Sequence, residues 1–140
     1  MSHFSPVNRI KILIGVLLFT AILRIGLNGV YPLMDKTEAR YGEIAREMVL
    51  NDNWVMPHLD PDIPFWGKPP LSFWLSALGF KFLGIHESAA RLPSVLLSIV
   101  MVYMVFYLGR LLRDKEFGLM ASCVLATTGV FFVNAGTVMT

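Results

Sequence analysis

The sequence predicts an all-α integral membrane protein, and three observations carry that prediction. The chain has 140 residues, of which 55% are hydrophobic and only 16% charged, a more apolar composition than is usual for a soluble domain of this size. Three apolar stretches are each long enough to cross a bilayer, which takes about 20 residues at a rise of about 1.5 Å. Most of the acidic residues lie in one polar segment, residues 31–91, between the first stretch and the second.

The first apolar stretch, residues 10–30, is the first predicted transmembrane helix. A cleaved signal peptide would also place cations such as Arg9 and Lys11 before an apolar run. It would need a small-residue cleavage site after that run, and none is evident, so a membrane span is favoured. Arg24 lies inside the stretch, and a charge there is costly in lipid, so we expect it to face protein or water.

The second and third predicted transmembrane helices cover residues 92–112 and 117–138. Arg110, Arg113 and Lys115 lie in the short turn between them. Short loops rich in Lys and Arg stay on the cytoplasmic side of a membrane, and Arg9 and Lys11 place the N-terminus there too. The segment 31–91 is therefore predicted to be extracytoplasmic in a multi-pass membrane protein.

The extracytoplasmic segment is predicted to contain two helices close to the membrane. Residues 35–50 have apolar side chains at helical spacing, namely Tyr41, Ile44, Ala45 and Met48. A second helix is expected to begin at Pro69 and Pro70 and to end at Gly84. Its broad apolar face and its short length favour a position along the membrane surface, with the face formed by Leu71, Trp74, Leu75, Leu78 and Phe82. Residues 58–64 are proline-rich and are expected to be irregular but stiff.

Charge and length exclude some functions and restrict others. A net charge of +2 without a block of Lys and Arg gives no reason to expect nucleic-acid binding. The single cysteine, Cys123, excludes an intrachain disulfide. Three helices and one loop enclose a catalytic cavity poorly, so we expect this chain to be the N-terminal piece of a larger protein and to be inactive alone.

Asp35 is a candidate general base. A carboxylate fixed within hydrogen-bond reach of an acceptor hydroxyl can take its proton when that hydroxyl attacks. The alternative is structural, because Asp35 and Glu38 have the spacing of a capping box at a helix N-terminus. The two roles are compatible, since a cap fixes a carboxylate in space.

Arg40 and Lys68 are candidate ligands of a phosphate group. Arg40 follows a helix N-terminus that favours anions, and its guanidinium can bind a phosphate in a forked geometry. Lys68 is a lone cation among Phe65, Trp66 and prolines, where partial desolvation would strengthen its attraction for an anion. The alternatives are ion pairs of Arg40 with glutamates on its own helix, and a Lys68 that reaches toward interfacial water.

A metal site is not predicted. His58, Asp60 and Asp62 alternate along the proline-rich stretch, but no paired His or Cys spacing accompanies them. A divalent metal is chemically possible there and is not supported, so no cofactor is expected.

Several motifs in a fixed order resemble one known family. They are TEARYGEIAREM at 37–48, Asn53-Trp54, PFWGKPPLSFWLSALGFKFLG at 64–84 and ESAARLPS at 87–94. This order resembles the N-terminal part of polyprenyl-phosphate-dependent membrane glycosyltransferases, the bacterial relatives of protein O-mannosyltransferases that include the lipid A aminoarabinose transferase.

The resemblance implies a GT-C fold, a multi-helix membrane domain whose first extracytoplasmic loop forms two juxtamembrane helices. It also implies that a loop carboxylate acts as the base and that basic loop residues hold the lipid phosphate. By position, the catalytic candidates are Asp35 and Glu38. The substrate-binding candidates are Arg40 and Lys68, with the neighbouring aromatics Tyr41 and Trp66.

Two positions depart from the family pattern. Many relatives carry the acid immediately before the glutamate, where this chain has Thr37, so either Asp35 or Glu38 is the base. Some relatives also have a glutamate before the lysine, where this chain has Gly67, which weakens the case for a metal further.

The function implied is an inverting transfer of a sugar from a polyprenyl-phosphate carrier to a hydroxyl on lipid A, protein or another glycan. Two alternatives remain open. One is a non-enzymatic membrane subunit or lipid-phosphate-binding module that uses the same cations. The other is a transporter segment, for which Arg24 and Asn28 are the only intramembrane polar candidates.

Overall fold

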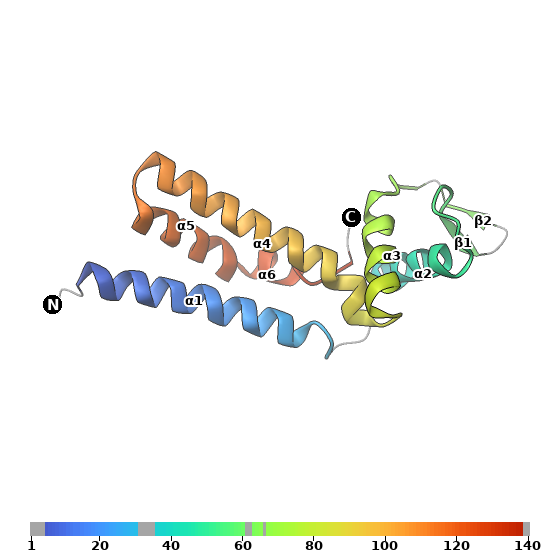
Figure 1. Ribbon diagram of the computed structural model, residues 1–140, viewed down its shortest axis with the longest axis horizontal. Helices are drawn as coiled ribbons and strands as arrows, with labels where there is room; N and C mark the ends of the chain where they lie inside the picture. The colour runs from blue at the N-terminus through green and yellow to red at the C-terminus, as the bar shows by residue number, and fades with distance from the viewer. Residues whose placement is uncertain (1–4, 31–35, 61–62, 66, 139–140) are drawn as a thin grey trace. The chain divides into compact units, whose positions relative to one another are not determined.

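The computed structural model describes residues 5–30, 36–60, 63–65 and 67–138, and its secondary structure is almost entirely helical (Figure 1). The elements are α1 (Pro6–Leu27), α2 (Lys36–Leu50), β1 (His58–Asp60), β2 (Ile63–Pro64), α3 (Leu71–Leu83), α4 (Glu87–Leu112), α5 (Lys115–Thr127) and α6 (Gly129–Asn134). Their order confirms the predicted all-α class.

The chain divides into two compact units. The first, called here the helix unit, comprises Met1–Gly26 and Leu96–Ala135. The second, called the loop unit, comprises Leu27–Val95 and Gly136–Thr140. The loop unit thus contains the whole segment predicted to be extracytoplasmic, and the helix unit contains most of the predicted spans.

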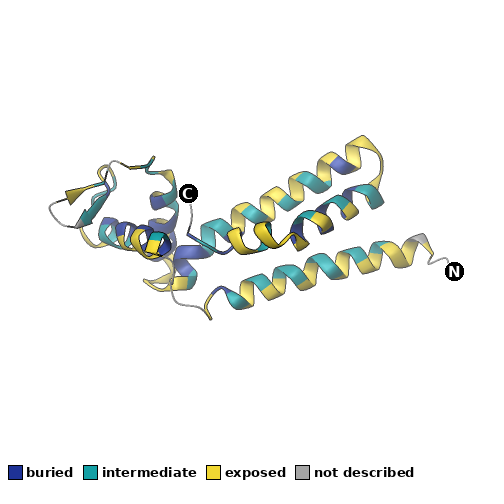
Figure 2. Ribbon diagram, turned by 180° about the vertical axis from the view of Figure 1, so that it is seen from behind, coloured by how far each residue is buried: buried dark blue, intermediate teal, exposed yellow. Residues whose placement is uncertain are grey.

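Among the described residues, two helices are long and apolar enough to cross a membrane, namely Val7–Leu27 of α1 and α4. Few residues of their most apolar windows are buried, whereas the central helix of a soluble protein would be mostly buried. Figure 2 shows exposed and half-buried residues along nearly all of α1. Apolar helices with uncovered surfaces are typical of a membrane protein.

The third predicted span is not one continuous helix in the structure. It is divided into α5 and α6 at Thr128, whose backbone is extended with ψ of 123°. Thr127 and Thr128 each bond a carbonyl one turn earlier through the hydroxyl, at 2.7 Å, and such bonds compete with the helical ladder. Gly129 follows, which favours the break further. A third membrane crossing by residues 117–138 therefore remains a prediction.

In the helix unit, individual side chains connect α1 to α5 and α6. The Arg9 guanidinium lies 3.5 Å from the Glu116 carboxylate, and the Cys123 thiol contacts the Leu13 carbonyl at 3.3 Å. The Arg24 guanidinium lies 5.5 Å from the centroid of the Phe132 ring. Of the two surroundings expected for Arg24, protein or water, the structure shows a contact with protein, through a cation–π interaction.

The hairpin of α4 and α5 is held by small residues. A Cβ atom on Gly109 would lie 2.7 Å from the Cα atom of Gly118, so neither position has room for a side chain. The Ser122 hydroxyl, which is fully buried, donates to the Val102 carbonyl at 3.2 Å. Close backbone approach at small residues is the usual packing of helices in membranes.

The loop unit has its own hydrophobic core. The predicted apolar face of α2 is buried in it, and the facing side of α3, the start of α4 and Val138 supply the rest (Figure 2). The core is formed by Tyr41, Ile44, Ala45, Met48, Phe73, Ala77, Phe80, Ala89, Ala90 and Val138.

Helix α3 lies where the prolines and the glycine predicted it. Pro70 is its N-cap residue and Gly84 its C-cap residue, with a φ of +93° that favours glycine. The apolar face predicted for the membrane surface, which includes Leu71, Leu78 and Phe82, is exposed, while the opposite side contacts α2. An exposed apolar face supports the interfacial position of α3, which stays a prediction.

A glycine and a proline together allow α3 to approach α4. Pro93 lies inside α4 and has no N–H, so the Ala89 carbonyl one turn earlier lacks its helical donor. Gly79 of α3 packs against that carbonyl, with no space for a Cβ atom. The Ser76 hydroxyl of α3 donates to the next carbonyl, that of Ala90, at 3.1 Å.

The prediction for residues 58–64 was wrong in one respect. The ends of this stretch are not irregular but form a short antiparallel pair, β1 and β2, with His58 opposite Pro64. The Phe65 N–H extends the pair by donating to the Pro57 carbonyl at 2.7 Å. The proline φ angle is compatible with an edge strand, which sequence reasoning did not weigh.

Candidate functional site

Three aromatic rings and one lysine meet on one side of α2. The ring of Tyr41 lies 5.4 Å from that of Phe73 and 6.4 Å from that of Phe65, and the last two are 5.8 Å apart. All three pairs have the edge-to-face arrangement that aromatic quadrupoles favour. The Lys68 ammonium lies 5.2 Å from the centroid of the Tyr41 ring. We call these four residues the aromatic–lysine cluster.

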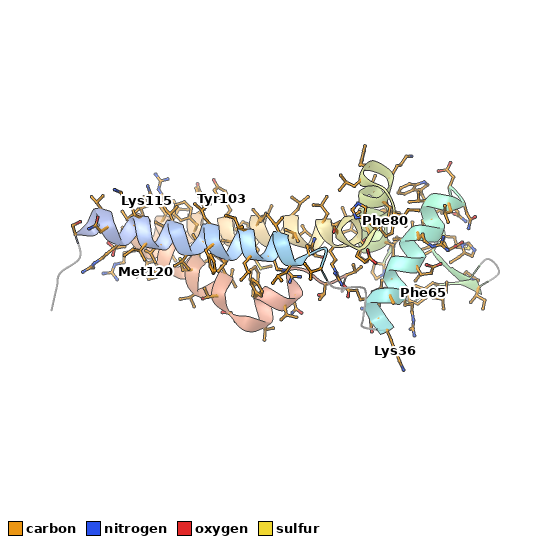
Figure 3. The ribbon with its side chains drawn as sticks, turned by 90° about the horizontal axis from the view of Figure 1, so that it is seen from below. Lys36, Phe65, Phe80, Tyr103, Lys115 and Met120 are labelled. Carbon is orange, nitrogen blue, oxygen red and sulfur yellow. The ribbon has the colours of Figure 1, made fainter. Side chains whose placement is uncertain are left out.

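The cluster is assembled from three segments of the loop unit. Tyr41 projects from α2, Phe73 from α3, and Phe65 follows β2, as Figure 3 shows for Phe65. Gly67 makes the turn possible, because a Cβ atom there would lie 2.7 Å from the end of the Phe65 ring. Residues from two separate motifs of the sequence, Tyr41 and Lys68, are thus brought into contact.

Lys68 is half-buried in this cluster. Rings on one side of an ammonium remove part of its water, and the quadrupole of the Tyr41 ring attracts the cation in return. A partly desolvated cation attracts an anion more strongly than one in bulk water. The site can therefore hold an anionic group, and the rings can contact an apolar chain beside it.

Arg40 is exposed on α2, and the alternative suggested for it from sequence is not found. The expected partners of Arg40 were Glu43 and Glu47, and both bond Arg46 instead. Arg46 donates to Glu43 at 2.9 and 2.6 Å and to Glu47 at 2.9 Å. The hydrogen bond from Arg46 lowers the pKa of Glu43. Within the described residues, the Arg40 guanidinium has no ion pair and is accessible to a ligand.

Glu38 lies in a different environment from Arg40. Its side chain and that of Arg91 are each only 5% exposed and form a forked ion pair. Arg91 Nε donates to Glu38 Oε1 at 2.8 Å, and a terminal nitrogen donates to Oε2 at 3.0 Å. The Val138 N–H also donates to Oε1, at 3.1 Å.

This geometry bears on the choice between the two candidate bases. Both oxygens of Glu38 accept bonds from the buried Arg91, and Oε1 also accepts one from the Val138 N–H, so neither oxygen is left open to an acceptor hydroxyl. The arrangement therefore favours Asp35 over Glu38 as the base. Asp35 and Trp66 lie outside the described residues, so the capping box and the position of the Trp66 ring are not described.

Sequence reasoning missed Arg91 as a site residue. A signal was present, because Arg91 stands between two alanines and an apolar stretch, and a cation in such surroundings is buried only when it is paired. The partner could not be identified, since Glu38 is separated from it by 53 residues.

The structure supplies no metal centre among the residues it describes, where no group of three or more His, Cys, Asp or Glu side chains gathers. His58 belongs to β1, and Asp62 lies outside the described residues. The expectation of no metal cofactor stays a prediction.

Comparison with solved structures identifies the class of fold. The crystal structure of ArnT from Cupriavidus metallidurans in the apo state superimposes with a TM-score of 0.71 at 22% sequence identity. The match covers 93% of this chain and 24% of that one. The fold is thus the N-terminal part of a GT-C membrane fold, as the sequence predicted.

Comparison of sequences then gives the family. Residues 67–140 match the model of the dolichyl-phosphate-mannose-protein mannosyltransferase family, and this chain belongs to that family. A similar protein is the undecaprenyl phosphate-alpha-4-amino-4-deoxy-L-arabinose arabinosyl transferase of Pectobacterium atrosepticum, 31% identical over 86% of this chain and 21% of its own length. That of Shewanella sediminis is 31% identical over 93% of this chain and 23% of its own length. The chain spans about a fifth of the length of the curated relatives it matches.

Proposed function

We propose that this chain forms the donor-binding part of an inverting glycosyltransferase that takes its sugar from a polyprenyl-phosphate carrier. The acceptor is a hydroxyl group on lipid A, protein or another glycan. The reaction takes place at the extracytoplasmic face of the bacterial inner membrane. Residues beyond those present in this chain complete the enzyme, and the chain alone is inactive.

The aromatic–lysine cluster is the observation that carries this proposal. A polyprenyl phosphate has an anionic head on a long apolar chain, and it requires a cation beside apolar surface near a membrane. Lys68 over the Tyr41 ring supplies that pairing, with Phe65 and Phe73 behind it. The exposed Arg40, one residue before Tyr41, offers a second cation for the same phosphate.

The proposed chemistry needs few groups. The acceptor oxygen attacks the anomeric carbon from the side opposite the carrier, and the bond between that carbon and the phosphate oxygen breaks with its electron pair going to the phosphate. The acceptor proton passes to the Asp35 carboxylate. Lys68 and Arg40 stabilise the charge that grows on the departing phosphate. Displacement from the opposite side inverts the anomeric configuration.

Transfer from a radiolabelled polyprenyl-phosphate sugar tests the proposal. The complete product of the gene, purified in detergent, is expected to move label from the carrier to an acceptor from the cell envelope. Binding of the carrier without any transfer would instead identify a lipid-phosphate-binding module. If the Lys68→Ala variant still binds the carrier and still transfers the sugar, the cluster is excluded as the phosphate site.

The proposed location is tested by cysteine labelling. Single cysteines introduced at the exposed positions Asp52 and Asp114 are expected to react with a membrane-impermeant reagent from opposite sides, with position 52 outside. Labelling of both from the cytoplasm would contradict an extracytoplasmic site.

A further inference from the structure

The Glu38–Arg91 ion pair connects four segments of the loop unit. Arg91, in the second turn of α4, holds Glu38 in the first turn of α2 through two bonds. A third bond runs from Arg91 to the Asn28 carbonyl, just after α1, at 3.0 Å. The Val138 N–H closes the arrangement from the segment that follows α6.

Stability alone is a poor explanation for such a pair. Removing two charges from water is costly, and well-packed apolar side chains in their place often give an equally stable protein. What an apolar replacement cannot supply is direction, because a forked guanidinium–carboxylate pair fixes both distance and orientation. The pair is therefore suited to hold one turn of a helix in a defined place.

That turn leads directly into the proposed site. Tyr41 is three residues after Glu38, so both side chains lie on the same buried face of α2. A shift of the first turn of α2 would therefore displace the Tyr41 ring from Lys68.

We propose that Arg91 and Glu38 are positioning residues, which set the first turn of α2 so that the aromatic–lysine cluster keeps its place. The inference rests on the proposed function and assigns a role to two buried groups that the chemistry does not use directly. Arg91 directs its bonds to Glu38 and Asn28 from a buried position, so it acts through Glu38.

The test uses the complete gene product with three substitutions. Arg91→Met leaves the buried Glu38 carboxylate without its cation, and Glu38→Leu leaves the buried Arg91 guanidinium without its carboxylate. Each single variant is therefore expected to lower the melting temperature. The double variant Glu38→Leu/Arg91→Met leaves no uncompensated charge, and we expect most of the melting temperature to return. Arg46→Met serves as the control, because Arg46 is a half-buried arginine of α2 that is paired with two glutamates of the same helix.

The rate of turnover is expected to distinguish a positioning role of the ion pair from a role in stability alone. In the double variant it should remain roughly a hundredfold below that of the unmodified protein, since a misplacement of about 1 Å costs that much. The affinity for polyprenyl phosphate alone should change less than turnover does. Arg46→Met should leave both unchanged. A double variant that regains turnover together with its melting temperature would show that the pair only stabilises the fold, and would overturn the proposal.

A second measurement does not depend on activity. The rate at which an amine-reactive reagent modifies Lys68 is compared with the rate at Lys36, which is exposed at the start of α2 and points outward in Figure 3. The ratio is expected to rise several-fold in the double variant, because Lys68 loses its cover when Tyr41 moves. An unchanged ratio would overturn the positioning role. A raised ratio in a protein that transfers no sugar would instead leave the positioning role in place and reject the proposed function.

Discussion

The loop unit and the helix unit are built on different principles. The loop unit buries a contiguous apolar core and a forked ion pair, so its fold is determined largely within itself. The helix unit packs through glycines and a serine, and it exposes most of its large apolar side chains. We infer that the helix unit is adapted to lipid or to further helices, whereas the loop unit is adapted to hold a site.

The largest expected effect is a loss of turnover when an aspartate of the loop unit, but not one of the helix unit, is replaced by asparagine. Asparagine caps a helix as well as aspartate does but cannot accept a proton. Asp35→Asn is therefore expected to fold normally, to bind polyprenyl phosphate and to lose at least about a hundredfold in turnover, as removal of a general base does. The measurement is initial-rate sugar transfer by the complete gene product.

A matched control for that variant lies in the helix unit. Asp114 is the N-cap residue of α5 and accepts the Phe117 N–H at 2.8 Å. Asp114→Asn preserves this bond and should leave turnover unchanged. Full activity of Asp35→Asn would show that Asp35 serves only as a cap and that the base lies elsewhere.

The next effect tests the core of the loop unit. Phe73 and Phe82 lie on the same helix, but Phe73 is 1% exposed and Phe82 is 81% exposed. Phe73→Ala should destabilise the protein by about 3–5 kcal/mol, as is usual for a buried phenylalanine, whereas Phe82→Ala should have little effect in detergent. Thermal unfolding of both variants makes the comparison, and equal losses would mean that the loop unit has no core of its own.

A smaller effect contrasts a glycine from each unit. Gly79→Ala places a methyl group against the Ala89 carbonyl and should cost about 1–3 kcal/mol by overpacking. A Cβ atom on Gly15, in α1, would have nothing within 4 Å, so Gly15→Ala should stabilise its helix by about 0.5–1 kcal/mol. Opposite shifts of the melting temperature are the expected result, and a stabilising Gly79→Ala would contradict the close contact of α3 with α4.

The smallest expected effect is a pH dependence on the surface of α2. The pKa of Glu43 is lowered by its bond to Arg46, so the bond contributes stability above the ordinary glutamate pKa. That contribution is lost as the pH falls through the lowered value. Glu43→Gln should therefore lose a little stability at neutral pH and show a flatter acid dependence. A dependence identical to that of the unmodified protein would show that the pair contributes nothing measurable.

Periodicity and turn chemistry made much of the fold predictable. The spacing of Tyr41, Ile44 and Met48 predicted the buried face of α2, and Pro70 with Gly84 predicted the bounds of α3. The break at Thr128 was not predicted, because hydropathy does not register hydroxyl bonds to the helix carbonyls. The β1–β2 pair was missed because proline is compatible with an edge strand as well as with an irregular loop.

The site could be predicted only in part. Tyr41 and Lys68 were identified through separate motifs, and the structure brings them into contact. Arg91 was missed because its partner is distant in sequence, and sequence alone does not show which buried charges meet. Glu38 was assigned a possible catalytic role because of its position near Asp35 in the sequence. Its contacts with Arg91 and Val138 favour instead a role in positioning the first turn of α2.

Gly67 constrains how this site can vary. The Phe65 ring occupies the space that any side chain at position 67 would need, with 2.7 Å between a Cβ atom and the ring. A glutamate at that position, as some relatives resembling this chain have, is therefore incompatible with Phe65 in its present place. An acidic group before the lysine therefore requires the Phe65 ring to leave its present place. Within this family, we expect the identity of residue 67 to co-vary with the identity or the conformation of residue 65.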